Sequence, residues 1–116
     1  MKKNLTKKEY RIYYIKDGVR IKGVHSKIRG DARYIRGDVS GILGDASDIF
    51  GDVSFIRGDV SDIFGNVSDI EGDVSFIRGN VSGILGNVSG IRVDLNACEI
   101  TEEDRKNGID IEDLIN

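Results

Sequence analysis

The sequence predicts an all-β protein, a three-sided parallel β-solenoid of about 21 residues per coil with an N-terminal hairpin cap and a short α-helical C-terminal cap. Three observations lead to this prediction. A seven-residue repeat runs without interruption through residues 21–97, its composition opposes a helix, and its variable positions match at every third heptad. We therefore expect an N-terminal cap at 1–20, a repeat solenoid at 21–97 and a C-terminal cap at 98–116.

The repeat consists of eleven heptads, from IKGVHSK at 21–27 to IRVDLNA at 91–97. With positions labelled a to g, a is always Ile and c is Gly in the first ten heptads. Position d is mostly Asp or Asn, e is mostly Val, f is mostly Ser, and b and g vary.

A coiled coil is the first alternative, because Ile at a and Val at e are spaced by four and three residues. Each of the ten glycines at c would cost a helix roughly 0.8–1 kcal/mol, and Val, Ser, Asp and Asn are poor helix formers. Gly before Asp or Asn, followed by a β-branched residue, instead indicates a bend and a short strand. We expect Ile and Val to face the core and the d side chains to cap the bends.

The variable positions predict the coil length, because equivalent residues in adjacent coils stack about 4.8 Å apart and tend to match. Three sets recur every 21 residues: the aromatic residues Tyr34, Phe55 and Phe76 at g, the arginines Arg36, Arg57 and Arg78 at b, and Leu43, Phe64 and Leu85 at b. Three heptads per coil follow from this spacing.

Both flanks are suited to capping the ends of a solenoid. The run EYRIYYIKDGVRIKG at 9–23 predicts a hairpin that turns at Asp17-Gly18. At the other end, Thr101 and Asp104 predict a capped helix over EEDRKN that Gly108 terminates, and IDIEDLI supplies apolar residues to cover the last coil.

The composition favours a cytoplasmic protein. Cys98 is the only cysteine, the basic N-terminus is followed by no apolar run, and no stretch has the ~18 consecutive apolar residues of a membrane helix. The net charge is −3, yet residues 1–36 hold 12 Lys and Arg against 3 acids, and residues 37–116 hold 5 against 17.

No pattern predicts an enzyme, a cofactor or a metal site. His25 replaces the inward Val of its heptad and is expected to be structural, and Cys98 is expected to be a small buried residue of the cap. RGD occurs at 29–31, 36–38 and 57–59, but Gly and Asp there belong to the repeat, so we expect no integrin binding.

The segment GDVSG at 37–41 resembles the pentapeptide-repeat pattern, with two residues added per repeat. This resemblance implies that Gly at c and Val at e face the core. Residues 21–116 as a whole resemble small phage and prophage proteins with Gly-Asp/Asn-Val-Ser heptads and a closing segment like CEITEEDRKNGIDIEDLI. The second resemblance implies no activity.

In such a phage-like solenoid without catalytic motifs, we expect a non-enzymatic binding protein, such as a phage-encoded inhibitor of a host defence or DNA-processing enzyme of the anti-CRISPR or DNA-mimic kind. The alternatives are an oligomeric scaffold or virion-associated protein, and nucleic-acid binding by the basic region 1–36. Three surfaces are predicted: a partner-binding ladder of Tyr34, Arg36, Phe55, Arg57, Phe76 and Arg78; a homodimer interface of Leu43, Phe50, Phe64 and Leu85; and a DNA-like acidic ladder of Asp31, Asp52, Asp73 and Asp94.

Overall fold

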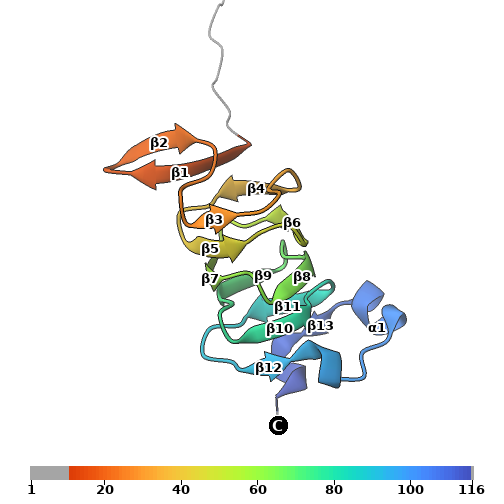
Figure 1. Ribbon diagram of the computed structural model, residues 1–116. Helices are drawn as coiled ribbons and strands as arrows, with labels where there is room; N and C mark the ends of the chain where they lie inside the picture. The colour runs from red at the N-terminus through yellow and green to blue at the C-terminus, as the bar shows by residue number, and fades with distance from the viewer. Residues whose placement is uncertain (1–10, 116) are drawn as a thin grey trace, which may run out of the picture.

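The computed structural model describes residues 11–115, and its short strands stack as parallel coils into a β-solenoid (Figure 1). The strands form two sheets. The hairpin sheet contains, in spatial order, β12 (Val93–Asp94), β10 (Ile77–Asn80), β8 (Ile63–Asn66), β6 (Ile49–Asp52), β4 (Ile35–Asp38), β1 (Ile12–Lys16) and β2 (Val19–Lys22). The second sheet contains β13 (Ile109–Asp110), β11 (Ile84–Asn87), β9 (Ile70–Asp73), β7 (Ile56–Asp59), β5 (Ile42–Asp45) and β3 (Ile28–Arg29).

The β-solenoid is confirmed, but the three-sided coil of 21 residues is wrong. Ile35 on β4 pairs with Gly51 on β6, 16 residues later, and Ile42 on β5 pairs with Gly58 on β7 at the same offset. One coil therefore takes two heptads, and consecutive heptads lie in opposite sheets. Because the repeat returns after two heptads while the pairing offset is 16 residues, neighbouring strands are displaced by two residues along their length.

The interior follows the predicted inward positions. Ile at a and Val at e lie between the two sheets; Ile35, Val39, Val53 and Val60 are fully buried. Each buried side chain of this size contributes roughly 1.5–3 kcal/mol. No polar side chain is buried within residues 11–115, so the core is a stack of Ile and Val.

Serine at f and the acid or amide at d join adjacent coils. Ser61 Oγ accepts a hydrogen bond from the backbone N–H of Asp45 in the preceding coil, at 3.0 Å. Its own backbone N–H donates to the carboxylate of Asp59 at 2.9 Å. The same bond from a d backbone N–H to a Ser Oγ 16 residues later recurs along both sheets, so these side chains lock the register as well as cap the bends.

The N-terminal hairpin is confirmed. β1 and β2 are antiparallel, and both turn residues have positive φ, 53° at Asp17 and 78° at Gly18, as a two-residue hairpin turn of type I′ requires. β1 also pairs in parallel with β4, so the hairpin extends one sheet and projects beyond the side of the stack (Figure 1).

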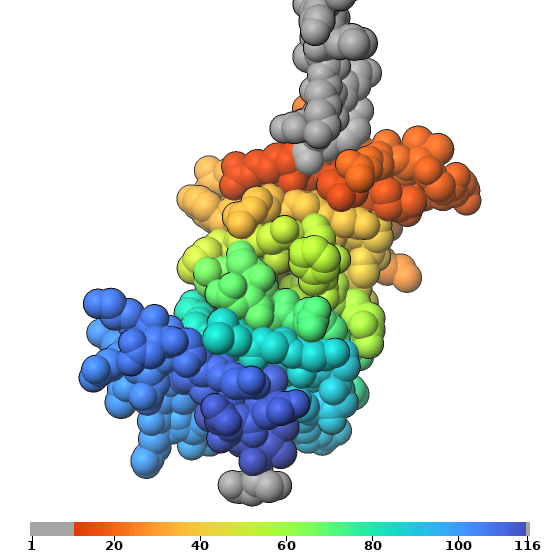
Figure 2. Space-filling view, turned by 180° about the vertical axis from the view of Figure 1, so that it is seen from behind, coloured from red at the N-terminus to blue at the C-terminus, as the bar shows by residue number. Residues whose placement is uncertain are grey.

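The C-terminal cap is also confirmed. Thr101 and Asp104 form the predicted capping box of α1 (Glu102–Asn107), and Gly108 ends the helix. Two 3₁₀ helices, η1 (Leu95–Ala97) and η2 (Ile111–Leu114), bury Leu95 and Ile111 against the last coil. Figure 2 shows the hairpin and this cap at opposite ends of the stack.

Candidate interaction surfaces

The outer face of each sheet is made by positions g, b and d, because a, c and e point inward. Two heptads per coil decide which of these side chains share a face. Residues 21 apart fall on opposite sheets, whereas residues 14 apart at one repeat position fall on neighbouring strands of one sheet.

The predicted aromatic–arginine ladder is divided between the two sheets. Its hairpin-sheet members are Tyr34, Arg36, Phe76 and Arg78, and its second-sheet members are Phe55 and Arg57. All six side chains are exposed, so their outward orientation is confirmed and their stacking in one column is wrong.

The predicted apolar strip is divided in the same way. Phe50 and Phe64 lie on β6 and β8 of the hairpin sheet, and Leu43 and Leu85 lie on β5 and β11 of the second sheet. The exposed side chains of Arg57 on β7 and Glu71 on β9 occupy the two strands between these leucines. The four residues therefore form no continuous strip.

The acidic ladder is not a column either. Asp52 and Asp94 lie on the hairpin sheet, while Asp31 and Asp73 lie on the second sheet. Acids do occupy successive d positions of the second sheet, but hydrogen bonds from the Ser two residues later lower the pKa of Asp45, Asp59 and Asp73, and Arg33 lowers the pKa of Asp31. These carboxylates accept hydrogen bonds inside the coil, which differs from a row of free phosphate-like charges.

The hairpin sheet instead gathers most of the exposed aromatic side chains. Pairing of Ile35 with Gly51 places Tyr34 beside Phe50 on the next strand, and Phe64 and Phe76 follow on later coils. These four rings range from 43% exposed at Phe64 to 57% at Tyr34. Large apolar side chains this exposed on one sheet indicate a contact surface.

Arginines accompany the aromatic rings. The guanidinium carbon of Arg20 lies 4.5 Å from the Tyr13 ring centre, Arg33 lies 5.6 Å from that of Tyr34, and Arg92 lies 5.2 Å from that of Phe76. Such cation–π pairs hold a charged group flat over an exposed ring. The sequence analysis missed Tyr13, Arg20, Arg33 and Arg92; a 14-residue spacing, visible for Arg78 and Arg92 and for Phe50 and Phe64, was the available signal.

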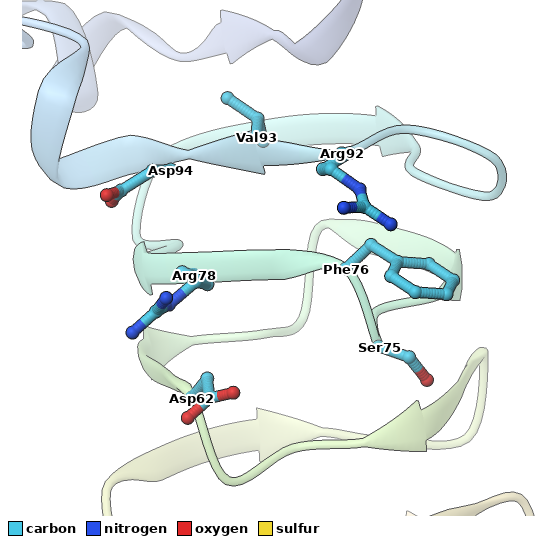
Figure 3. Close-up of a pocket in the computed structure, with 7 residues that line it drawn as sticks. All are labelled: Asp62, Ser75, Phe76, Arg78, Arg92, Val93 and Asp94. Carbon is cyan, nitrogen blue, oxygen red and sulfur yellow. The ribbon is translucent and has the colours of Figure 1, made fainter.

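A hollow of about 470 Å³ opens on the hairpin sheet across β10 and β12 (Figure 3). At one end Arg92 is directed toward the Phe76 ring, and at the other Arg78 lies between Asp62 and Asp94. Neither arginine forms a salt bridge within residues 11–115. The hollow therefore offers two guanidinium groups and an aromatic face to a partner.

The two singular residues have local roles. His25 Nδ1 accepts the backbone N–H of Lys27 at 3.2 Å, so Nε2 is the donor to the Val39 carbonyl at 3.0 Å, and the ring packs edge-on against Tyr14. This arrangement fits the predicted structural role. Cys98 is half-buried, less than predicted, and its Sγ lies 3.4 Å from the Asp94 carbonyl. In residues 11–115 no His, Cys, Asp and Glu side chains cluster as metal ligands.

Comparisons with protein-family models, with curated proteins and with solved structures found no match. Within the described part of the chain, no helix has the length and apolar character needed to cross a membrane. Candidate surfaces must therefore be judged on their own geometry.

Proposed function

We propose that the protein is a non-enzymatic binding protein that docks on a partner protein through the hairpin-sheet face between β6 and β12. The observation that supports this proposal is the sharing of one regular sheet by Phe50, Phe64, Phe76, Arg78 and Arg92. Aromatic and arginine side chains dominate the free energy of protein interfaces, and a stacked sheet holds them in fixed positions before binding.

The chemistry of this face defines the partner surface. Phe50 and Phe64 require an apolar patch, while Arg78 and Arg92 require carboxylates, because neither arginine has a salt-bridge partner within residues 11–115. A partner carboxylate that enters the hollow beside Phe76 would accept hydrogen bonds from the guanidinium groups.

The biological setting follows from the resemblance to phage proteins. We place the protein in the cytoplasm of a phage-infected bacterium, where the Cys98 thiol stays reduced, and we assign the partner to host defence or DNA-processing enzymes. Inhibition would come from covering the partner's working surface. The division of the acidic ladder removes the main support for DNA mimicry, so the proposal rests on the aromatic–arginine face.

The test captures a partner from a bacterial lysate with the tagged protein and then measures its affinity for matched variants. Phe64→Glu should weaken binding at least about tenfold, or about 1.4 kcal/mol, because it places a charge at the centre of the face. Phe55→Glu, an equally exposed aromatic on the second sheet, should leave the affinity unchanged. Equal effects of the two variants would contradict the proposed face.

A second copy of the chain is the other occupant that this face admits, and it corresponds to the predicted homodimer or scaffold. Light scattering decides between them. A dimeric wild type that Phe64→Glu converts to a monomer would assign the face to self-association, since a two-fold axis brings each introduced charge onto its own copy.

A further inference from the structure

Positive charge is concentrated at the N-terminal end of the stack. Residues 11–36 contain eight basic residues and two acids: Arg11, Lys16, Arg20, Lys22, Lys27, Arg29, Arg33 and Arg36 against Asp17 and Asp31. The fold decides which of them share a surface, and this surface lies outside the β6–β12 region assigned to the partner protein.

The hairpin sheet brings four of these cations onto one outer face. On β1, Ile12 and Tyr14 pack against the core, so the alternate residues Arg11 and Tyr13 point outward. Pairing of Ile12 with Gly37 places Arg11 beside Arg36 of β4.

Antiparallel pairing extends this face onto β2. Tyr13 pairs with Lys22, and Ile15 pairs with Arg20, so both cations share the outer face of Tyr13. Arg20 also lies over the Tyr13 ring. The outer side of β2, β1 and β4 therefore presents Arg11, Arg20, Lys22 and Arg36, which we name the basic platform.

Two tyrosines flank the arginines of the basic platform. Tyr34 lies two residues before Arg36 on the chain, and Tyr13 lies two residues after Arg11. Four residues along a strand and one strand across separate the two rings by roughly 14 Å, from strand spacings of 3.3 and 4.8 Å. About four nucleotides span this distance at 3.4 Å each.

These cations are not neutralised by the described part of the chain. The salt bridge of this region joins Arg33 to Asp31, and none within residues 11–115 involves the four platform cations. The nearby Asp38 carboxylate accepts hydrogen bonds from the backbone and hydroxyl of Ser40. A polyanion can therefore release counterions from all four positions.

We propose that the basic platform binds single-stranded nucleic acid. Arg11, Arg36 and Lys22 contact successive phosphates, and unpaired bases stack on Tyr13 and Tyr34. A flat sheet that exposes aromatic rings among cations matches the physical requirements of single-strand binding, in which bases need open π-faces and the backbone needs positive charge. A duplex meets only the second requirement, because its base faces are already stacked.

The test measures fluorescence anisotropy of a labelled oligothymidine of about 12 nucleotides with the full chain. Raising the salt from about 50 to about 200 mM should weaken binding about 50-fold, because four single-strand phosphate contacts give a log–log slope near −3. The four lysines of residues 1–10 can add to this slope, equally in wild type and variants.

Matched variants on the two sheets separate the basic platform from general positive charge. Tyr34→Ala should weaken binding about tenfold, as loss of one stacked base does, while Phe55→Ala at the same repeat position on the second sheet should not. Arg36→Ala should reduce the salt slope by about 0.7, and Arg57→Ala should leave it unchanged. Both tyrosine positions are exposed or half-buried on the surface, so an unchanged melting temperature should accompany these losses.

Three results would overturn the proposal: binding that ignores Tyr34→Ala, equal affinity for the matching duplex, or binding to anionic phosphatidylserine vesicles without binding to the oligonucleotide. Phe64→Glu, which tests the partner-protein face, should retain full oligonucleotide affinity. Failure of one proposal is thereby distinguished from failure of the other.

Discussion

At the scale of single residues, the repeat is conserved along the chain because each small or polar side chain contacts the next coil. A methyl group on Gly44 would collide with the Asp59 carboxylate and the Ser61 hydroxyl, and its φ of +96° already disfavours any side chain. Glycine at c therefore leaves room for the Asp–Ser pair that holds the coils in register.

Replacement of Gly44 by Ala should cost more than the strain of positive φ alone. Gly90→Ala is the control, because Gly90 also has positive φ, +78°, but has open space where the methyl would lie. We expect a loss of about 1–2 kcal/mol for Gly90→Ala and at least about 3 kcal/mol for Gly44→Ala in urea denaturation. Equal losses would show that the contact with the next coil is unimportant.

The d carboxylates make stability depend on acid. Hydrogen bonds from Ser47, Ser61 and Ser75 lower the pKa of Asp45, Asp59 and Asp73 below the usual 3.8. A depressed folded-state pKa stabilises the fold above pH 3.8, and this contribution disappears as the pH falls through the folded-state pKa.

The variant with Asn at these three positions should therefore lose less stability than wild type between about pH 6 and pH 3. Asn already serves at d, where its side-chain oxygen accepts the same Ser N–H, as at Asn66 and Ser68. The control replaces Asp48, Asp62 and Asp69, whose carboxylates accept no hydrogen bond within residues 11–115. Identical pH profiles of melting temperature for the two triple variants would contradict this account.

At the scale of elements, side chains of the flanks fasten the caps to the stack. Arg105 on α1 donates through one nitrogen to the Asn80 and Ser82 carbonyls, both at 2.7 Å. Ionised donors form stronger bonds than neutral ones, so this residue ties the C-terminal cap to the last coils.

Arg105→Ala should destabilise the protein by about 1.5–3 kcal/mol and loosen α1. Lys106→Ala, an exposed change one position later, should cost little. Amide hydrogen exchange is the informative readout, because protection should fall over 102–107 and persist in the middle coils. Unchanged protection over α1 would show that the cap is held by other contacts.

The elements were predictable because each depends on neighbours in sequence. Asp17-Gly18 specifies the hairpin turn, Thr101 and Asp104 specify the start of α1, and Ile and Val specify the inward face. The number of heptads per coil depends on packing across the core, and the same inward pattern suits two sides or three. Matches at exposed positions such as Tyr34 and Phe55 then misled, because no contact requires those side chains to stack.

At the scale of the whole molecule, two heptads per coil give the protein two chemically different faces. The hairpin sheet gathers Tyr13, Tyr34, Phe50, Phe64 and Phe76, and the basic platform and the partner-protein face occupy its opposite ends. A three-heptad coil would have mixed these residues with those of the second sheet. Both proposed interactions therefore depend on the coil length.

Disulfide cross-linking measures the coil length directly in a Cys98→Ser background. Tyr34 and Phe50 are neighbours on adjacent strands, about 4.8 Å apart at Cα and within reach of a disulfide, whereas Tyr34 and Phe55 lie on opposite sheets about 10 Å apart. Dilute oxidation should link Tyr34→Cys with Phe50→Cys within one chain, seen as a mass loss of about 2 Da as two thiol hydrogens leave. It should leave Tyr34→Cys with Phe55→Cys reduced. An intramolecular link in the second pair but not in the first would contradict the two-heptad coil and the division of surfaces that follows from it.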